Sequence, residues 1–364
     1  MKSAQLKYRV LFAGGGTGGH LFPALAVAEA LKELLPEVDI LFAGNKKKIE
    51  GRIVPKYGYK FKPLWIQGFA RRLTLDNVLF PVKLLVSGIQ SLLINMKFKP
   101  IVAVGSGGYV SGPAIWGAKV MGAKIILLEQ NSYPGVTTRM LAKYADEIHL
   151  SYEDSKKYFV NKEKLFLTGC PTLVRDKKDQ IEVDHRNRNR KKLVVLGGSG
   201  GAKSINEAIA QIIPDLVKED IVITWQTGDA YFENYKGFQK EHIKVVPFIH
   251  DMITEYNEAD LVIARAGATT IAELSNLGKA SILIPSPNVA ENHQYFNAKS
   301  IADAGGCILI EDKDILYQLK KAVTDLIKDD EKIGQMSKNI RRFGNPQAAK
   351  VVAERIRNLC GVES

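Results

Sequence analysis

A histidine directly after a glycine-rich turn is the clearest candidate for chemistry in this chain. Residues 14–20 read Gly-Gly-Gly-Thr-Gly-Gly-His, after a short apolar run and before a helical pattern. Such glycines expose backbone N–H groups at a helix start, where an anion or a closely approaching substrate can bind. An imidazole can accept a proton near neutral pH. The segment predicts a ligand site with His20 as candidate general base.

The same turn also fits the Gly-x-Gly-x-x-Gly pattern of dinucleotide-binding folds. Those folds place an Asp or Glu at the end of the second strand for the ribose. Residues 43–46 read Ala-Gly-Asn-Lys, with no acid, which disfavours NAD binding. A tight turn without a ligand, and a packing or capping role for His20, remain the alternatives.

Two further glycine-rich turns could face phosphate or a bulky polar substrate. Residues 197–204 read Gly-Gly-Ser-Gly-Gly-Ala-Lys-Ser, with Ala202 where a P-loop needs glycine. This departure disfavours an ATPase but leaves phosphate or nucleotide contact by the loop and Ser199. The turn Gly105–Gly112 either admits a polar substrate or only opens the helix near Pro113.

A fourth turn, residues 265–273, reads Arg-Ala-Gly-Ala-Thr-Thr-Ile-Ala-Glu. Small residues at a helix start leave N–H groups and the helix dipole for a pyrophosphate. Glu273 could accept hydrogen bonds from ribose hydroxyls, or it is a solvated helix residue. The Asp-x-Asp triplet at residues 312–314 precedes a helix and is interpreted as capping charge. The sequence predicts no metal site and no cofactor.

Short apolar runs alternate with helical patterns along the whole chain, which indicates βαβ units and parallel sheets. The predicted strands are Arg9–Ala13, Ile40–Ala43, Ile101–Val104, Lys124–Leu128, Glu147–Leu150, Leu193–Leu196, Ile221–Trp225, Lys244–Val246, Leu261–Ala264 and Ser281–Ile284. We predict an α/β chain with domains at 1–169 and 193–345, a linker at 170–192, and a C-terminal helix (346–364) that packs back on the first domain.

The composition restricts the class of protein and of partner. The chain has 364 residues, 46% of them hydrophobic, three cysteines without metal-ligand spacing, and a net charge of +12. These values fit a two-domain globular protein in a reducing compartment, with an anionic partner. No signal peptide is predicted. The basic stretch Arg186–Lys192 has no interleaved aromatics, which disfavours nucleic acid.

The segment from Phe69 to Lys99 mixes apolar and basic residues with a single acid, Asp76. Polar residues and Pro81 interrupt it, so it does not predict a spanning helix. It fits either a core-facing helix with surface lysines or an interfacial patch on an anionic membrane. The candidate membrane residues are Arg71, Arg72, Leu79, Phe80 and Lys83.

Six motifs in order resemble those of the MurG family, the peripheral N-acetylglucosaminyltransferases of peptidoglycan synthesis. They are Gly15–His20 with Pro23, Glu129–Asn131, Gly197–Ser199, Phe248–Met252, Gly267–Glu273 and His293–Gln294. The resemblance extends from about Tyr8 to about Leu359. It implies the glycosyltransferase B fold, in which two Rossmann-like, doubly wound parallel-sheet domains are separated by a cleft.

The resemblance also implies the substrates and their ligands. The second domain would hold UDP-N-acetylglucosamine, and the first would take lipid I, undecaprenyl-pyrophosphoryl-N-acetylmuramoyl pentapeptide. His20 matches the candidate base. The implied substrate ligands are Thr17, Gly18 and Gly19 for the sugar or pyrophosphates, Asn131 and Gln294 for the N-acetylglucosamine, Ser199, Ala268, Thr269, Thr270, Ile271, Ala272 and Glu273 for the diphosphate and ribose, and Ile249 for the uracil.

Two positions depart from the family pattern. Arg175, a further candidate donor ligand, comes two residues later than the family's arginine. Gly200 stands where glutamine is usual, which removes a side-chain amide near the diphosphate.

The predicted reaction is inverting transfer of N-acetylglucosamine to the 4-hydroxyl of the muramoyl sugar, giving lipid II. The predicted location is the cytoplasmic face of the cell membrane, as a peripheral protein, with other cell-wall synthesis proteins as possible partners. The alternatives are another B-fold enzyme, either a lipid glycosyltransferase with a different acceptor or a UDP-N-acetylglucosamine 2-epimerase, and a basic nucleotide- or nucleic-acid-binding module.

Overall fold

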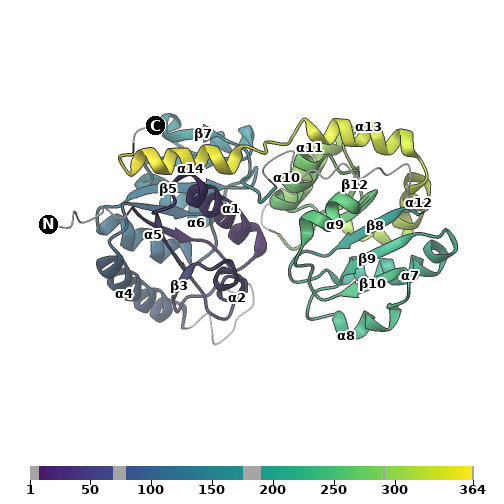
Figure 1. Cartoon of the computed structure of the whole chain (residues 1–364), viewed down its shortest axis with the longest axis horizontal. Coiled ribbons are helices and arrows are strands. Elements are labelled where there is room, and N and C mark those ends of the chain that lie inside the picture. The colour runs from purple at the N-terminus through teal and green to yellow at the C-terminus, as the bar shows by residue number, and fades with distance from the viewer. Residues whose placement is uncertain (1–7, 69–78, 175–189, 290–291, 363–364) are drawn as a thin grey trace. The chain divides into compact units, whose positions relative to one another are not determined.

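The computed structural model describes residues 8–68, 79–174, 190–289 and 292–362. They form two α/β units, one of residues 1–173 with 347–364 and one of residues 174–346 (Figure 1). The boundary after Leu173 falls inside the expected linker, most of which lies outside the described residues. Each unit is built on one parallel sheet.

The sheet of the first unit has seven strands in the order β3-β2-β1-β4-β5-β6-β7. Their bounds are β1 Arg9–Ala13, β2 Asp39–Gly44, β3 Lys60–Pro63, β4 Val102–Gly105, β5 Lys124–Glu129, β6 Glu147–Leu150 and β7 Leu165–Leu167. The helices are α1 Gly18–Leu34, α2 Ile49–Ile53, α4 Phe80–Phe98, α5 Ser111–Val120, α6 Val136–Leu141 and α14 Ala348–Leu359.

The second unit has six strands in the order β10-β9-β8-β11-β12-β13. They are β8 Lys192–Leu196, β9 Val222–Gln226, β10 Ile243–Val246, β11 Leu261–Arg265, β12 Ser281–Ile284 and β13 Ile308–Leu309. The helices are α7 Lys203–Lys218, α8 Phe232–Tyr235, α9 Met252–Glu258, α10 Ala268–Leu277, α11 His293–Asp303, α12 Ile315–Ile327 and α13 Asp330–Arg341.

The strand order reverses at the first strand of each unit, so that β1 lies between β2 and β4 and β8 between β9 and β11. Ligands of such sheets bind outside the carboxyl ends of the strands at this switch point. The turns after β1 and β4 therefore lie side by side, as do those after β8 and β11.

The ten predicted strands are confirmed, each to within one residue at either end. Their apolar runs are buried between helices, as the fully buried β1 and β8 residues show. Strands β3, β7 and β13 were not predicted. They are short edge strands with exposed or half-buried residues, so they lack the continuous apolar run that marks a central strand.

The C-terminal helix α14 is part of the first unit and lies beside α1 (Figure 1). Val352, Ala353 and Ile356 are fully buried in one cluster with residues of α1. Val352 and Ala353 lie four and three residues before Ile356, so the three side chains share one face of the helix.

An ion pair also joins α14 to the sheet, and its arginine lies over an aromatic ring. The Arg355 guanidinium donates to both carboxylate oxygens of Glu147 on β6, and His149 Nε2 lies 3.1 Å from Glu147 Oε2. The same guanidinium lies 4.6 Å above the Phe166 ring. Burial by itself raises the pKa of Glu147, but the bonds from His149 and Arg355 lower it to about 2.

Helix α4 is inverted, with polar residues inward. Its buried residues recur every four positions and are Lys83, Ser87, Ser91 and Asn95. Ser91 Oγ donates to the carbonyl oxygen of Ala114 on α5, and Asn95 Nδ2 donates to that of Ser91. A Cβ on Gly117 would lie 2.3 Å from Ser91 Oγ, so the close approach of α5 requires glycine there.

Phe80, Ile94 and Phe98 of α4 pack partly on the core, but most of its other apolar residues face outward. Five of them, spaced three, four, four and three residues apart, are 50–68% exposed: Val82, Leu85, Ile89, Leu93 and Met96. Exposed Trp116 and Val120 of the adjacent α5, and Met121 directly after it, extend this surface. We call these eight residues the α4–α5 apolar face.

Lys83 was expected as a surface cation, and the structure corrects this. It is 4% exposed, with its Nζ 6.0 Å from the centre of the Trp65 ring, because its position belongs to the inward face of α4. Leu79 is exposed and Phe80 packs partly on the core, while Arg71 and Arg72 lie outside the described residues. Within the described part of the chain, none of the helices has the length and hydropathy needed to span a bilayer.

Replacing Arg355 by Met should loosen α14 and weaken the pH dependence of stability. Glu147 has a pKa of about 2 in the folded chain against 4.5 as its ordinary value. Its ionised form therefore contributes stability above about pH 4.5 that is lost as the pH falls toward 2. At pH 7 the variant should lose ~1–3 kcal/mol, the range for a charged hydrogen bond, and this difference should shrink below pH 4.5.

Urea unfolding from pH 7 to 3, with hydrogen exchange of the α14 amides as local readout, measures both effects. Exposed Lys350 on the same helix provides the control variant Lys350→Met, which should change neither. An Arg355→Met protein with the stability profile of the unmodified chain would show that the ion pair does not hold α14.

Candidate functional site

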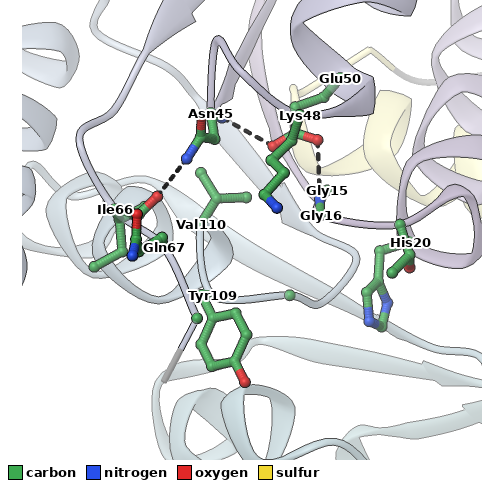
Figure 2. A pocket seen from close by; sticks show the side chains of 13 residues that line it. Gly15, Gly16, His20, Asn45, Lys48, Glu50, Ile66, Gln67, Tyr109 and Val110 are labelled. Atoms are coloured by element: carbon green, nitrogen blue, oxygen red, sulfur yellow. Dashed lines mark hydrogen bonds between the residues drawn. The ribbon is translucent and has the colours of Figure 1, made fainter. Parts of the chain in front are cut away.

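The carboxyl edge of the first sheet contains a cavity of about 470 Å³ at its switch point (Figure 2). Four segments line it: the turn Gly15–His20 after β1, the Asn45–Glu50 segment after β2, Ile66–Gly68, and Gly108–Val110 after β4. Of the predicted ligands, Thr17 and His20 line this cavity. Gly18 is buried and Gly19 exposed in the first turn of α1.

His20 is oriented by the neighbouring glycine turn. Its Nδ1 lies 3.0 Å from the carbonyl oxygen of Ser106, and Ser106 Oγ donates to the carbonyl oxygen of His20 at 2.6 Å. A carbonyl oxygen only accepts, so Nδ1 carries the hydrogen and the lone pair of the neutral ring lies on Nε2. This tautomer is the one that a general base acting through Nε2 needs.

Close packing between the two glycine turns keeps this geometry. Gly107 and Gly108 have φ angles of +95° and +80°. A Cβ on Gly107 would lie 2.7 Å from His20 Nδ1, and one on Gly108 would lie 2.3 Å from the carbonyl oxygen of Gly15. Both positions therefore require glycine, which favours a built site over a turn that only opens α5.

Glu50 is a site residue that the sequence did not predict. It is 1% exposed, and its carboxylate accepts the N–H of Gly16 and that of Asn45, each at 2.9 Å (Figure 2). A Cβ on Gly15 would lie within 2.5 Å of this carboxylate. The N–H of Gly16 is therefore used within the protein and is not among the turn amides left to a ligand.

Asn131 follows β5, the strand next to β4, and a buried carboxylate positions it. Glu129 Oε1 accepts from the backbone N of Asn131 at 3.0 Å and from its Nδ2 at 3.3 Å, while Oε2 accepts from Gly135 N at 3.0 Å. Burial raises the pKa of Glu129, and these bonds only partly offset it. Ser155 Oγ donates to the carbonyl oxygen of Asn131 at 2.9 Å and orients the backbone.

In the second unit, the turn Gly197–Ala202 after β8 packs on the end of β9. Gly198 and Gly201 have φ angles of +79° and +76°, and a Cβ on Gly201 would lie 2.1 Å from the carbonyl oxygen of Thr227. Ser199, half-buried, is in this turn. Buried Gln226 at the end of β9 donates from Nε2 to the carbonyl oxygen of Gly198 at 2.9 Å.

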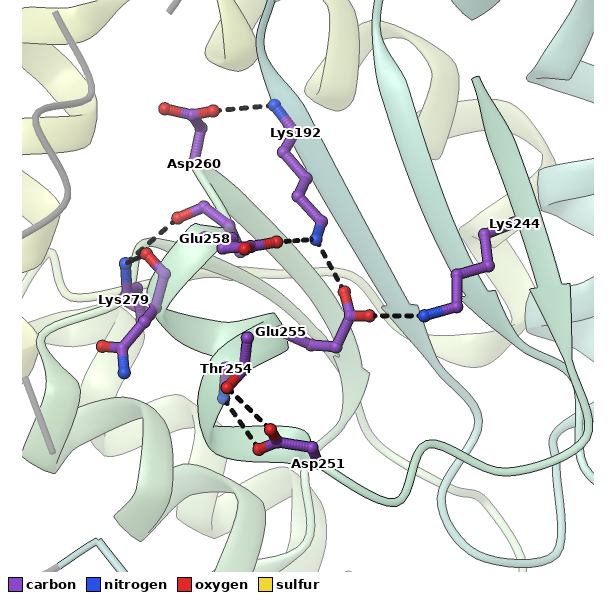
Figure 3. A network of polar contacts seen from close by, with 10 residues as sticks. Lys192, Lys244, Asp251, Thr254, Glu255, Glu258, Asp260 and Lys279 are labelled. Atoms are coloured by element: carbon purple, nitrogen blue, oxygen red, sulfur yellow. Dashed lines mark hydrogen bonds and ion pairs between the residues drawn. The ribbon is translucent and has the colours of Figure 1, made fainter. Parts of the chain in front are cut away.

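Ile249 lies between β10 and α9 with its side chain in the core and 6% exposed. Its N–H donates to Gln226 Oε1 at 2.8 Å. The next helix, α9, is held to the sheet by ion pairs (Figure 3). Glu255 bridges Lys192 at 2.7 Å and Lys244 at 2.9 Å. Although burial raises the pKa of Glu255, the two ammonium groups lower it overall.

The turn after β11 opens α10 at Gly267, which has no side chain to cap the first-turn N–H groups. Ala268, Thr269 and Ile271 are buried, while Thr270, Ala272 and Glu273 are half-buried on the other face. Glu273 Oε2 accepts from the Tyr256 hydroxyl at 3.2 Å. Burial raises the pKa of Glu273 to about 7, and the Tyr256 bond opposes the increase.

The sequence suggested that Asp312 caps a helix, but the structure shows other contacts for its carboxylate. Its carboxylate pairs with Arg265 at the end of β11 and accepts from Ser204 Oγ at 2.6 Å in the first turn of α7. Arg265 also donates to Ser204 Oγ at 2.8 Å and to the carbonyl oxygen of Pro285 at 3.2 Å. These contacts of Asp312 and Arg265 fix the starts of the segments that follow β8, β11 and β12.

Gln294 lies in the first turn of α11 and accepts from Ser286 N at 2.8 Å. The structure therefore brings Ser199, Ile249, the α10 turn and Gln294 to the carboxyl edge of the second sheet. Arg175 lies outside the described residues.

Two family models match this chain. Residues 10–150 match the glycosyltransferase family 28 N-terminal domain, and residues 192–355 match the glycosyltransferase family 28 C-terminal domain.

Curated relatives cover nearly the whole chain. A Flavobacterium psychrophilum protein named UDP-N-acetylglucosamine–N-acetylmuramyl-(pentapeptide) pyrophosphoryl-undecaprenol N-acetylglucosamine transferase is 41% identical over 364 residues, covering 97% of this chain and 98% of that protein. A Clostridioides difficile protein of the same name is 40% identical over 365 residues, covering 96% of this chain and 88% of that protein.

Solved structures share the arrangement. A crystal structure of Acinetobacter baumannii MurG matches with a TM-score of 0.71 and 26% identity, covering 96% of this chain and 99% of that one. A putative UDP-N-acetylglucosamine 2-epimerase from Listeria monocytogenes matches with a TM-score of 0.69 and 14% identity, covering 97% and 96%. At that identity the second likeness is one of fold alone.

Proposed function

The chain belongs to glycosyltransferase family 28, and we propose that it transfers N-acetylglucosamine from UDP-N-acetylglucosamine to lipid I. The observation that carries the proposal is the identity of 40–41% to proteins named for this transfer, over 96–97% of the chain. The product would be lipid II, the disaccharide precursor of peptidoglycan. His20, oriented for base catalysis, supports a transfer that removes a hydroxyl proton.

The proposed chemistry is a single inverting displacement. The 4-hydroxyl of the muramoyl sugar attacks C1 of N-acetylglucosamine as the bond from C1 to the diphosphate breaks. His20 Nε2 accepts the hydroxyl proton, while the Ser106 carbonyl holds Nδ1–H and fixes the ring. The leaving UDP carries the developing negative charge, which oriented N–H groups stabilise.

The second sheet is the proposed donor site. The uncapped N-terminus of α10 and the turn around Ser199 supply N–H groups to the diphosphate. Glu273 lies in the second turn of α10, where its carboxylate can accept from ribose hydroxyls. The segment around Ile249 lies beside the uracil, Gln294 beside the sugar, and the first-unit residues Thr17, Gly18, Gly19 and Asn131 complete the proposed substrate ligands.

Release of UDP from UDP-N-acetylglucosamine, with and without a lipid I analogue, tests the function. A transferase releases UDP only with the acceptor and forms the disaccharide. An epimerase converts the donor without acceptor, and a binding module does neither. Either of these last two results would overturn the proposal.

We further propose that the α4–α5 apolar face lies on the cytoplasmic surface of the cell membrane, where lipid I is held by its polyprenyl chain. Soluble monomers rarely expose a contiguous apolar face without a partner. Polar and small residues packed inward with apolar residues outward are the arrangement of helices that face lipid. The net charge of +12 favours an anionic bilayer as the partner surface.

Replacing His20 by Ala should lower kcat about a hundredfold or more, the scale of general base catalysis. Donor affinity should change little, because the imidazole acts on the acceptor proton. Steady-state kinetics with the lipid I analogue and titration with UDP-N-acetylglucosamine measure the two quantities. His242→Ala, directly before β10 in the other unit, is the control. Near-normal turnover in His20→Ala would remove this residue from the mechanism.

Binding of UDP-N-acetylglucosamine should strengthen as the pH rises through about 7. Glu273 has a pKa of about 7, and its ionised form is the better acceptor for ribose hydroxyls. Since the donor itself does not titrate there, its affinity should rise roughly tenfold from pH 6 to 8. Glu273→Gln should bind more weakly and lose this pH dependence.

Tyr256→Phe is a second variant for the same measurement. It removes the hydrogen bond that lowers the Glu273 pKa, so the rise in donor affinity with pH should occur at a higher pH. Calorimetric titration at pH 6, 7 and 8 gives all three profiles. A pH dependence that survives in Glu273→Gln would assign it to another group.

Replacing Leu85, Ile89 and Leu93 by Ser should reduce binding to anionic vesicles. At ~1 kcal/mol per side chain removed from the bilayer, the loss is on the order of a hundredfold. Activity on vesicle-borne lipid I should fall, and activity on a water-soluble analogue should not. Leu316→Ser with Tyr317→Ser, exposed on α12, is the matched control. Equal loss on both acceptors would contradict a membrane role.

A further inference from the structure

Gln226 joins two segments of the second unit that are distant in sequence. It is the last residue of β9, and its side chain is 2% exposed. Its Nε2 donates to the Gly198 carbonyl oxygen at 2.9 Å, and its Oε1 accepts from Ile249 N at 2.8 Å. A carbonyl oxygen only accepts and a backbone N–H only donates, so these partners fix the orientation of the amide.

The two partners belong to different parts of the proposed donor site. Gly198 is in the turn after β8 that contains Ser199, and Ile249 is in the segment between β10 and α9. The Gly201 and Gly228 backbones also lie close together, and Gly201 lies close to the Thr227 carbonyl oxygen, next to Gln226. Gln226 is therefore bonded both to the glycine turn and to the Ile249 segment.

The Ile249 segment has separate anchors at its ends. Before it, Thr227 N and Gly228 N donate to the carbonyl oxygens of Val246 and Pro247 at 3.0 and 3.2 Å. After it, Asp251 accepts from Thr254 N at 3.2 Å and caps α9, and Glu255 holds that helix to Lys192 and Lys244 (Figure 3). Loss of the Gln226 amide would leave these anchors in place and release the middle of the segment.

We infer that Gln226 is a positioning residue that fixes the distance between the diphosphate loop at Ser199 and the uracil segment at Ile249. This inference rests on the proposed donor site. A ligand that spans both parts gains from their correct spacing, whereas a ligand that uses one part does not. Gln226 should therefore matter for UDP-N-acetylglucosamine and much less for uridine.

Two variants separate positioning from packing. Gln226→Leu keeps the side-chain volume and removes both hydrogen bonds. Gln226→Glu at high pH keeps an acceptor for Ile249 N–H but faces the Gly198 carbonyl oxygen with a second acceptor. Once protonated, the same carboxyl has an O–H that donates to Gly198 and a C=O that accepts from Ile249. Gln226→Glu should thus recover as the pH falls, which a loss of packing does not explain.

The control is Gln239, an exposed glutamine in the segment before β10 whose side chain also bonds to the backbone. Gln239 Oε1 accepts from Val245 N on β10 at 2.8 Å, away from both proposed loops. Gln239→Leu removes a side chain to backbone bond of the same kind. If the loss of any such bond lowers the ligand affinities in a general way, Gln239→Leu should lower them too.

The experiment measures the affinities of UDP-N-acetylglucosamine, without acceptor, and of uridine for the full chain and its variants at pH 6 and 8. We expect Gln226→Leu to weaken the sugar nucleotide at least tenfold and uridine less than threefold, with Gln239→Leu unchanged. We expect the ratio of the two affinities in Gln226→Glu to approach that of the unmodified chain at pH 6 and to fall at pH 8. The ratio cancels pH effects that Glu273 has on both ligands.

The outcomes distinguish failure of the proposed function from failure of the inference about Gln226. If the unmodified chain does not bind UDP-N-acetylglucosamine, the proposed function fails. If it binds and Gln226→Leu weakens both ligands equally or neither, Gln226 does not set the spacing. Should Gln226→Leu fail to fold, the pH series of Gln226→Glu decides alone, and a ratio independent of pH overturns the inference.

Discussion

Both candidate sites depend on buried polar side chains that bind the backbone of glycine turns. The glycines of such a turn have no side chains to pack, and glycine loses more conformational freedom on folding than other residues. The Glu50 carboxylate holds the turn after β1, and the Gln226 amide holds the turn after β8. Each clamp comes from the end of the strand next to the turn, or from the segment that follows it, because the parallel sheet brings these carboxyl ends to one edge.

The clamps also decide which backbone groups remain for a ligand. Glu50 takes the N–H of Gly16, and Gln226 takes that of Ile249. At α10 the cap residue is Gly267, which has no side chain that could bind the first N–H groups. A carboxylate placed against one glycine turn and an uncapped helix at another give the two edges different electrostatics. In the proposed function, the second edge binds the diphosphate and the first holds His20, which takes the proton of the attacking hydroxyl.

Helix α4 places polar side chains against the rest of the first unit and exposes apolar side chains on the surface. Four buried positions with polar side chains contribute little apolar burial to the first unit. Their hydrogen bonds and the glycine at position 117 allow close packing on α5 instead. The apolar residues left outside form a surface that water does not favour. This is the arrangement expected if the acceptor is anchored in a lipid bilayer.

The fold itself does not decide between transferase and epimerase. The MurG crystal structure and the putative epimerase superpose almost equally well, with TM-scores of 0.71 and 0.69. What differs is the sequence identity, which is 26% to the MurG structure and 14% to the putative epimerase. The proposed function therefore rests on His20, Glu273 and the glycine turns together with the relatives of 40–41% identity.

The sequence by itself determined where the central strands and the four glycine turns lie along the chain, because buried parallel strands are continuous apolar runs and sharp turns need glycine. It also singled out His20 and Glu273 by their place after such turns. It did not determine the edge strands β3, β7 and β13, which lack an apolar run. Only the tertiary structure showed that Lys83 is buried, that Asp312 pairs with Arg265, and that Glu50 and Gln226 hold the turns. These roles depend on contacts between residues that are 23 to 47 positions apart or lie on inward helix faces, and no local pattern records such contacts.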